Sequence, residues 1–258
     1  MNGVNLFKTI YNRKSIRNYI QEKLEWDVIE DILNYIDQLP MLIDGIGTEI
    51  KLVSNIEEKQ GFTGPFTVKA PYYICISSEE KEGYLLNAGY LMQHINLYIQ
   101  SRGLGACFLG ATRPGKELSS TMKYKYIITL AFGKSSEILH RDSSEAKRLP
   151  EEELTVYKED ISSDINELLN AARLAPSSLN SQPWRFVAYH NRIHVFTKKY
   201  PIIVRPISKL KMLDMGIMLA NMLIAADELW INVELDRLES IAKKKFKNNE
   251  YVLSLIVK

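Results

Sequence analysis

Three basic residues flank a single serine close to the start of the chain, in the stretch RKSIR at positions 13–17. Arginine offers a planar fork of N–H donors that matches two oxygens of a phosphate group. Arg13, Ser15 and Arg17 therefore have the composition of a phosphate clamp. The alternative is a run of solvated surface charge, which is the commoner interpretation of so short a motif.

A second candidate is the glycine-rich stretch GLGACFLGATRPG at positions 103–115. Glycine lets backbone amides approach a ligand closely, because no Cβ stands in the way. The stretch follows an expected helix instead of a strand, and its glycine spacing is not that of the dinucleotide-binding fingerprint. A helix C-terminus with a tight turn would explain the same glycines. Both interpretations remain open at this point.

A third candidate is the string APSSLNSQPWRF at positions 175–186, which places five polar side chains in one loop. Pro176 ends the helix-like run before it, and the aromatic residues after it begin a strand-like run. Such a long string is more restrictive than a pair of glycines, although an ordinary helix-terminating loop is the alternative. A fourth stretch, AKRLP at 146–150, would by itself be exposed linker charge.

Hydrophobic periodicity predicts the elements that must position these stretches. Apolar residues recur at helical spacing through 28–40, where Asp27 is the expected N-cap, and through 165–176, where Asp164 is the expected N-cap. A strand is expected at 70–77, and a hairpin over 185–197 that turns at His190-Asn191-Arg192. Long apolar helices and a few further strands complete the pattern, which predicts an α+β fold.

The order of these elements repeats along the chain. Laying Ile29 on Ile165 also pairs Pro40 with Pro176. Three pairs of segments match in the same order: 28–40 with 165–176, 85–105 with 212–232, and 126–134 with 251–258. The repeat favours two similar halves that share one core, whereas chance alignment of amphipathic helices is the alternative.

Composition restricts the class of protein. The chain has 258 residues and a net charge of +2, from 33 basic and 31 acidic residues, so we expect no nucleic-acid or membrane partner. The only cysteines, Cys75 and Cys107, are too few for a disulfide framework. The N-terminal stretch lacks the apolar core of a signal peptide, and no apolar run has membrane-spanning length. We therefore expect a soluble, cytoplasmic protein.

Together the four stretches resemble the FMN-dependent nitroreductase family. RKSIR resembles its N-terminal Arg-x-Ser-x-Arg/Lys flavin motif, and residues 86–110 resemble its long core helix and the glycine loop that faces the flavin ring. AKRLPEEELTVY at 146–157 resembles the basic stretch that reaches the FMN phosphate. APSSLNSQPWRFV resembles the loop that in the family follows the first helix.

The resemblance implies a role for each matching residue. Arg13 and Arg148, helped by Lys147, would bind the FMN phosphate, and Ser15 the ribityl chain or phosphate. Arg17 would stabilise the negative charge of the reduced ring, and a backbone N–H of Gly110 or Ala111 would face flavin N5. The implied cofactor-binding residues are Arg13, Lys14, Ser15, Arg17, Leu109, Gly110, Ala111, Lys147, Arg148, Pro176, Ser177, Ser178 and Asn180. No catalytic side chain and no metal is expected, because the flavin supplies the chemistry.

The position of the Pro-Ser-Ser loop sets this chain apart from the family, whose homodimers build each flavin site from two subunits. Here the first helix ends in LPMLIDGIG, and the loop follows the corresponding helix of the second half. That half lacks Arg-x-Ser-x-Arg and has LWINVELDRLES at 229–240 in place of the glycine loop. We therefore expect an intramolecular pseudo-dimer with central sheets flanked by long helices. Residues 1–155 and 156–258 would be its halves, with one FMN site, functional as a monomer.

The activity implied is transfer of electrons from NAD(P)H through FMN to a small-molecule acceptor, such as a nitroaromatic or a quinone. Another chemistry of the family, such as reductive dehalogenation or flavin fragmentation, is an alternative. A flavin storage or sensor protein with little turnover is a second alternative. The four histidines form no metal-ligand pattern, and we expect His190 and His194 to lie at the solvated surface.

Overall fold

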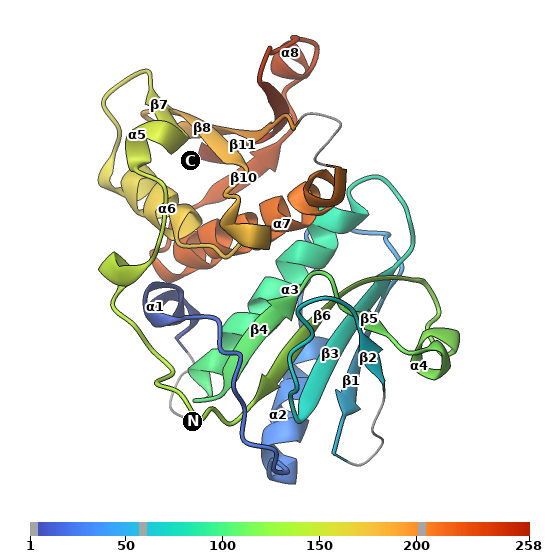
Figure 1. Cartoon of the computed structure of the whole chain (residues 1–258). Helices are drawn as coiled ribbons and strands as arrows, with labels where there is room; N and C mark the ends of the chain where they lie inside the picture. The colour runs from blue at the N-terminus through green and yellow to red at the C-terminus, as the bar shows by residue number, and fades with distance from the viewer. Residues whose placement is uncertain (1–4, 57–60, 201–204) are drawn as a thin grey trace. The chain divides into compact units, whose positions relative to one another are not determined.

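The structure is a computed structural model that describes residues 5–56, 61–200 and 205–258. The chain forms two compact units, Met1–Glu145 and Ala146–Lys258 (Figure 1). The division lies before the boundary expected after residue 155. Residues 146–155 belong to the second unit because Leu149 hydrogen-bonds there and Thr155 pairs with Phe186 in a parallel strand contact.

The first unit contains a four-stranded antiparallel sheet of order β1-β3-β6-β4. Its strands are β1 (Thr48–Ser54), β3 (Tyr72–Ser78), β6 (Lys125–Gly133) and β4 (Gly105–Leu109). The predictions at 70–77 and 126–134 are confirmed. β1 and β4 are edge strands that the hydrophobic pattern did not reveal, because β1 is only half-buried and β4 lies within the glycine-rich stretch.

Two of the helices of the first unit were predicted, with different ends. α2 (Trp26–Asp37) has Glu25 at its N-cap, so the prediction that Asp27 caps it is wrong. Asp27 instead lies in the first turn, where a carboxylate interacts favourably with the helix dipole. The remaining elements of the unit are α1 (Leu6–Asn12), α3 (Tyr84–Ser101), α4 (Lys116–Ser120), the 3₁₀ turn η1 (Ser143–Glu145), β2 (Phe62–Thr63) and β5 (Arg113–Pro114).

The second unit contains a five-stranded sheet of order β10-β11-β9-β8-β7. The predicted hairpin is confirmed as β8 (Trp184–Tyr189) and β9 (Arg192–Lys198), which turn at His190-Asn191. The other strands are β10 (Val233–Asp236), β11 (Asn249–Val257) and the parallel edge strand β7 (Thr155–Tyr157). β10 was not predicted, since it lies within the stretch that replaces the glycine loop.

α6 (Ser163–Arg173) packs against α7 (Arg205–Glu228) in the second unit. The Ser162 hydroxyl accepts a hydrogen bond from the backbone N–H of Ile165 at 3.2 Å, so Ser162, and not Asp164 as predicted, is the N-cap of α6. The shorter helical elements of the unit are α5 (Glu151–Leu154), the 3₁₀ turn η2 (Ser178–Asn180) and α8 (Glu239–Ala242).

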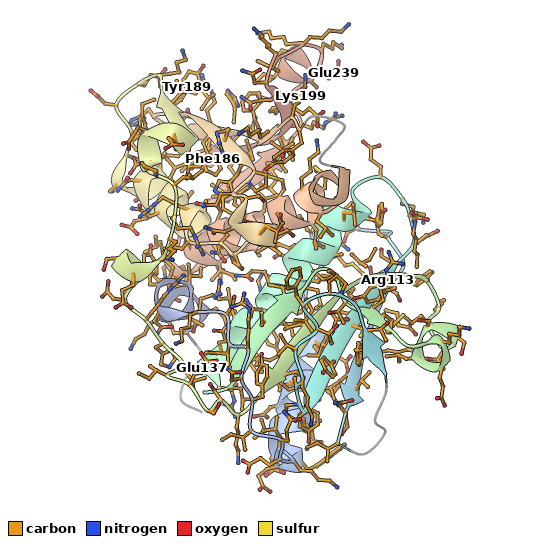
Figure 2. All side chains as sticks on the ribbon, viewed as in Figure 1. Arg113, Glu137, Phe186, Tyr189, Lys199 and Glu239 are labelled. Atoms are coloured by element: carbon orange, nitrogen blue, oxygen red, sulfur yellow. The ribbon has the colours of Figure 1, made fainter. Side chains whose placement is uncertain are left out.

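Buried side chains fill the space between the helices and the sheet of each unit, with Phe186 among those of the second unit (Figure 2). The prediction that His194 lies at the surface is wrong. Its ring is buried on β9, where Nδ1 lies 2.7 Å from the Ser254 hydroxyl of the neighbouring strand β11. His190 is exposed, as predicted. In the described part of the chain, no helix is both long and apolar enough to cross a membrane.

Candidate functional site

The Arg-x-Ser-x-Arg stretch runs beside β4, at the edge of the first unit's sheet. The backbone N–H of Ile16 donates to the carbonyl of Ala106 at 3.1 Å. The Ile16 side chain is buried with Cys107 and Leu109 in one hydrophobic cluster. Arg17, which follows Ile16, is exposed, and Ser15, which precedes it, is half-buried. Leu109, an implied cofactor contact, has its side chain in the core, so only its backbone is available to a ligand.

The polar side chains of this stretch gather near the thiol of Cys107. Arg13 is only 3% exposed, and its Nη2 donates to the Ser15 hydroxyl at 3.0 Å. Burial raises the pKa of the Cys107 thiol, whereas the positive charges of Arg17 and Arg13 and a hydrogen bond with Ser15 oppose that rise. Two cations therefore create a positive potential beside β4. Lys14 departs from this group, since its ammonium lies 4.0 Å from Glu137.

The glycines of the second stretch have separate explanations, and most of the stretch is a strand instead of the predicted loop. Gly103 adopts φ +77° after α3, and Leu104 N–H donates to Ile99 O at 3.3 Å, as in a Schellman helix end. A Cβ on Gly105 would lie 2.7 Å from Ile16 Cγ2. These two glycines thus serve the helix end and the packing of Ile16.

Gly110 and Ala111 form an exposed turn directly after β4. A segment that the sequence analysis missed packs against this turn. Gly64, at φ +138°, leaves no room for a Cβ beside the carbonyl of Ala111, and Thr67 Oγ1 lies 3.2 Å from Thr112 Oγ1. The sequence did contain a signal for this segment, because the two glycines of GFTGPF at 61–66 are typical of a turn.

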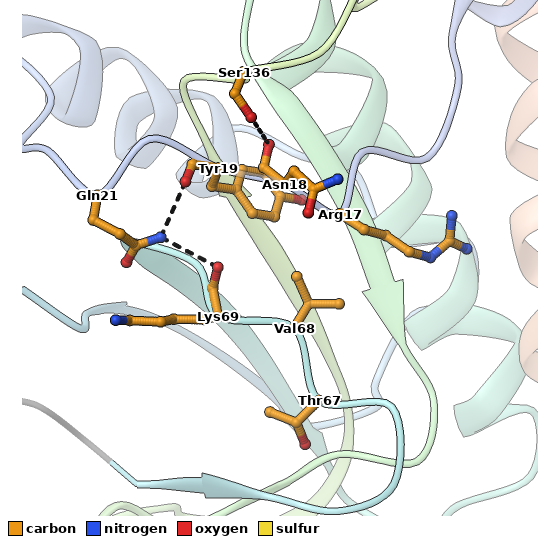
Figure 3. Close-up of a pocket in the computed structure, with 8 residues that line it drawn as sticks. All are labelled: Arg17, Asn18, Tyr19, Gln21, Thr67, Val68, Lys69 and Ser136. Carbon is orange, nitrogen blue, oxygen red and sulfur yellow. Dashed lines mark hydrogen bonds between the residues drawn. The ribbon is translucent and has the colours of Figure 1, made fainter.

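A cavity of about 600 Å³ lies next to the Arg-x-Ser-x-Arg stretch (Figure 3). Its lining residues are Arg17, Asn18, Tyr19, Gln21, Thr67, Val68, Lys69 and Ser136. Arg17 and Lys69 extend in opposite directions in Figure 3, so they do not converge on one anion. The Tyr19 hydroxyl donates to Ile16 O at 2.6 Å, and burial raises its pKa, so it is a structural group.

The Pro-Ser-Ser loop of the second unit has an unusual backbone. Leu179, Asn180 and Gln182 adopt φ of 52°, 55° and 43°, a region that L-residues occupy at a cost of about 1–3 kcal/mol each. Hydrogen bonds stabilise this conformation: the backbone N–H of Gln182 donates to the Ser177 hydroxyl at 2.9 Å. The loop includes Pro176, which lies three residues after Arg173, the last residue of α6, so the helix ends slightly earlier than the predicted stop at the proline.

The basic stretch 146–150 and the Pro-Ser-Ser loop form one hydrogen-bonded cluster. Arg148 donates to Asn180 Oδ1 at 3.2 Å, to Leu174 O at 2.9 Å and to Lys147 O at 3.1 Å. Asn180 Nδ2 also donates to Lys147 O at 2.9 Å, and the N–H of Leu149 donates to Gln182 Oε1 at 2.8 Å. Arg148 therefore bonds to three protein oxygens, while the side chain of Lys147 is exposed.

Asp214 on α7 is a buried carboxylate that the sequence analysis did not identify. Its oxygens accept hydrogen bonds from both the backbone N–H and the hydroxyl of Ser178, at 3.0 and 3.1 Å. Burial raises the pKa of Asp214 to about 7, and the hydrogen bonds from Ser178 only partly oppose that rise. Ser178, an implied flavin contact, thus directs its hydroxyl to the protein interior.

The predicted residues accordingly form two groups, one in each unit. In the first unit, Arg13, Ser15 and Arg17 lie near Cys107 of β4, and Leu109, Gly110 and Ala111 form the end of that strand and the turn after it. In the second unit, it brings together Lys147, Arg148, Pro176, Ser177, Ser178 and Asn180.

Comparison with known proteins identifies the family. Residues 5–226 match the family model described as "Putative TM nitroreductase". The chain resembles a structure from Thermotoga maritima described as a "putative nitroreductase", with a TM-score of 0.66 and 19% identity, over 98% of this chain and 94% of that one. No curated protein matches the chain.

Shorter solved structures cover only part of the chain. A nitroreductase family protein from Clostridium difficile 630 has 21% identity and a TM-score of 0.45, over 59% of this chain and 96% of that one. A protein named FMN-dependent nitroreductase, from Clostridium difficile R20291, has 22% identity and a TM-score of 0.43, over 56% and 95%. The family model spans most of the chain, and the protein therefore belongs to this nitroreductase family.

Proposed function

We propose that the protein is an FMN-dependent oxidoreductase that takes electrons from NAD(P)H and reduces a nitroaromatic, a quinone or a related electrophilic acceptor. The observation that carries this proposal is the arrangement along β4. The cations Arg13 and Arg17 and the hydroxyl of Ser15 lie near Cys107 of this strand, and an exposed backbone turn at Gly110 and Ala111 follows the strand. The chain also belongs to a nitroreductase family.

The chemistry of these donors fits FMN. A phosphate of roughly two negative charges near neutral pH needs charged donors where it is removed from water. Arg13 and Ser15 are positioned together by their mutual hydrogen bond, and they would hold the phosphate or the ribityl chain. Arg17 would add positive charge near the ring, where reduction places negative charge.

The second unit would contribute the Pro-Ser-Ser loop. The exposed residues of this loop are Leu179 and Asn180. Lys147, in the neighbouring basic stretch, is also exposed. Lys147 has the side chain available for a phosphate, whereas Arg148 holds the loop through its three hydrogen bonds. The proposal gives each of the two residue groups a role in binding the flavin.

When bound, FMN supplies the redox chemistry by accepting a hydride and passing electrons to the acceptor. The chain itself would bind the cofactor, hold its ring and offer a backbone N–H from Gly110 or Ala111. Cys107 is not suited to a redox role of its own, because its thiol is buried and burial raises its pKa.

The test is the absorbance spectrum of the purified protein with added FMN, followed by anaerobic stopped-flow mixing with NADPH or NADH. We expect a yellow complex that bleaches on mixing and recovers its colour when a quinone is added. A complex that stays yellow with either nicotinamide would favour flavin storage. A protein that binds no FMN would refute the proposal.

A further inference from the structure

Asp214 occupies a position on α7 that connects the helix to the strained Pro-Ser-Ser loop. Its carboxylate is 2% exposed, and its bonds to Ser178 involve the backbone N–H and the hydroxyl of the residue just before Leu179. Leu179 is the first loop residue with positive φ. The anchor therefore acts where the chain enters the strained conformation.

The first unit has the same anchor with a neutral residue. Asn87 on α3 precedes Gly89 by two positions, as Asp214 precedes Gly216 on α7. Its Oδ1 accepts hydrogen bonds from the backbone N–H groups of Leu42 and Ile43, at 3.0 and 3.2 Å, in the loop that follows α2. Leu42 and Ser178 each lie two residues after the proline that follows the helix.

The comparison shows what a carboxylate adds. Burying a charge is costly, and Asn87 holds its loop without one. A carboxyl group, however, has a second acceptor oxygen, and Asp214 uses both, since the Ser178 N–H donates to its Oδ1 at 3.0 Å and to its Oδ2 at 3.2 Å. In the loop anchored by Asn87 the positive-φ residue is a glycine, Gly45 at φ 75°, whereas the residues with positive φ after Ser178 are Leu179, Asn180 and Gln182.

We propose that Asp214 is a positioning residue of the flavin site, which fixes the Pro-Ser-Ser loop in its cofactor-binding conformation through both polar groups of Ser178. The inference rests on the proposed function, because the loop is a flavin contact only if FMN binds. Asp214 acts through Ser178 and needs no contact with the cofactor.

The test compares matched substitutions in the two units of the full-length protein. Asp214→Leu removes the acceptor on α7, Asp214→Asn keeps one acceptor oxygen, and Asn87→Leu removes the equivalent acceptor on α3. Dissociation constants for FMN come from flavin fluorescence titration. Hydrogen exchange of the 175–183 peptide in flavin-free protein reports on the loop independently of binding.

We expect Asp214→Leu to raise the FMN dissociation constant by at least about tenfold, since a buried partner is left without its acceptor. Exchange should accelerate in 175–183 before FMN is added. Asp214→Asn should restore binding to within about threefold, because an amide oxygen still accepts. Asn87→Leu should lower the melting temperature similarly but change the dissociation constant by less than about threefold.

A second variant covers the case in which Asp214→Leu does not fold. Ser178→Ala removes the loop hydroxyl and leaves the α7 core intact, and it should accelerate exchange in 175–183 and weaken FMN binding. Asp214→Asn serves as its control and should leave exchange in 175–183 close to that of wild type, because the amide oxygen still accepts from Ser178.

The outcomes separate the two proposals. Equal loss of FMN affinity in Asp214→Leu and Asn87→Leu, or a Ser178→Ala variant with wild-type exchange in 175–183 and wild-type affinity, would show that Asp214 is an ordinary core residue, with the proposed function still standing. A wild-type protein that binds no FMN would overturn both. In that case the exchange data would still show whether Asp214 holds the loop.

Discussion

The two units arrange equivalent strands in the same order around their sheets. In the first unit the order is β4-β6-β3-β1, and in the second it is β10-β11-β9-β8, with β7 added at one edge. A long helix, α3 or α7, precedes the edge strand β4 or β10 in each unit. The units thus share a scaffold, and the differences between them are concentrated in a few loops.

The corner after the long helix shows how the same geometry tolerates different residues. In the first unit Leu104 N–H donates to Ile99 O, and in the second Ile231 N–H donates to Ala226 O at 2.8 Å. Both are Schellman helix ends. The residue with positive φ is Gly103 in the first unit and Trp230 in the second, at φ +58° and 94% exposed.

The loop after the shorter helix shows the opposite case, in which equivalent positions have diverged in chemistry. The first unit has the apolar sequence PMLID, anchored by Asn87, and the second has the polar, strained PSSLN, anchored by Asp214. Arg13, Ser15 and Arg17 belong to the first unit only. The two units thus share their strand order but differ in the motifs that they carry.

The largest expected effect tests the motif that only the first unit contains. Arg13→Ala should raise the FMN dissociation constant by at least about tenfold, because a charge-assisted hydrogen bond contributes ~1.5–3 kcal/mol. Lys14→Ala is the control, since its surface pair with Glu137 contributes little, and should change affinity by less than about twofold. Equal effects in a fluorescence titration would place the phosphate away from Arg13.

A pH experiment sharpens the contrast between Asp214 and Asn87. Because burial raises the pKa of Asp214 from 3.8 to about 7, its stabilising contribution is complete below pH 4 and is lost as pH rises through 7. We therefore compare the melting temperature of Asp214→Asn with that of wild type at two pH values. The difference, variant minus wild type, should be about 3–6 °C higher at pH 8 than at pH 5. A difference between the two proteins that is independent of pH would contradict the raised pKa.

The two Schellman corners allow a reciprocal substitution with a smaller effect. Gly103→Ala should destabilise by about 1 kcal/mol, since a Cβ there meets no neighbour but disfavours positive φ. Trp230→Gly should stabilise by up to about 1 kcal/mol, because the exposed ring loses little packing. Chemical denaturation measures both. If the two changes had the same sign, the corners would not be equivalent.

The last prediction is that dilution has no effect, and it tests whether one chain is sufficient for flavin binding and activity. If both motif groups act in the same chain, flavin content and specific activity per chain should not change on dilution. Sedimentation velocity of the FMN complex, with activity measured at the same concentrations, checks this expectation. Flavin content and activity that fell together as a dimer dissociated would show that a second chain completes the site.

The sequence by itself determined the elements whose signals are local. Periodicity located α2, α6 and the β8–β9 hairpin, because side-chain spacing reports which face is buried. The restrictive strings Arg-x-Ser-x-Arg and Pro-Ser-Ser-x-Asn indicated a nitroreductase, and the family model confirms membership of a nitroreductase family.

Only the tertiary structure decided which partner each polar group takes. It turned Lys14 toward Glu137, bonded Arg148 to the Pro-Ser-Ser loop and paired Ser178 with Asp214, all of which depend on residues distant in sequence. It also assigned Gly105 to the packing of Ile16, which lies far from it along the chain. Residue type fixes what a side chain can bond, whereas the fold fixes what lies within reach.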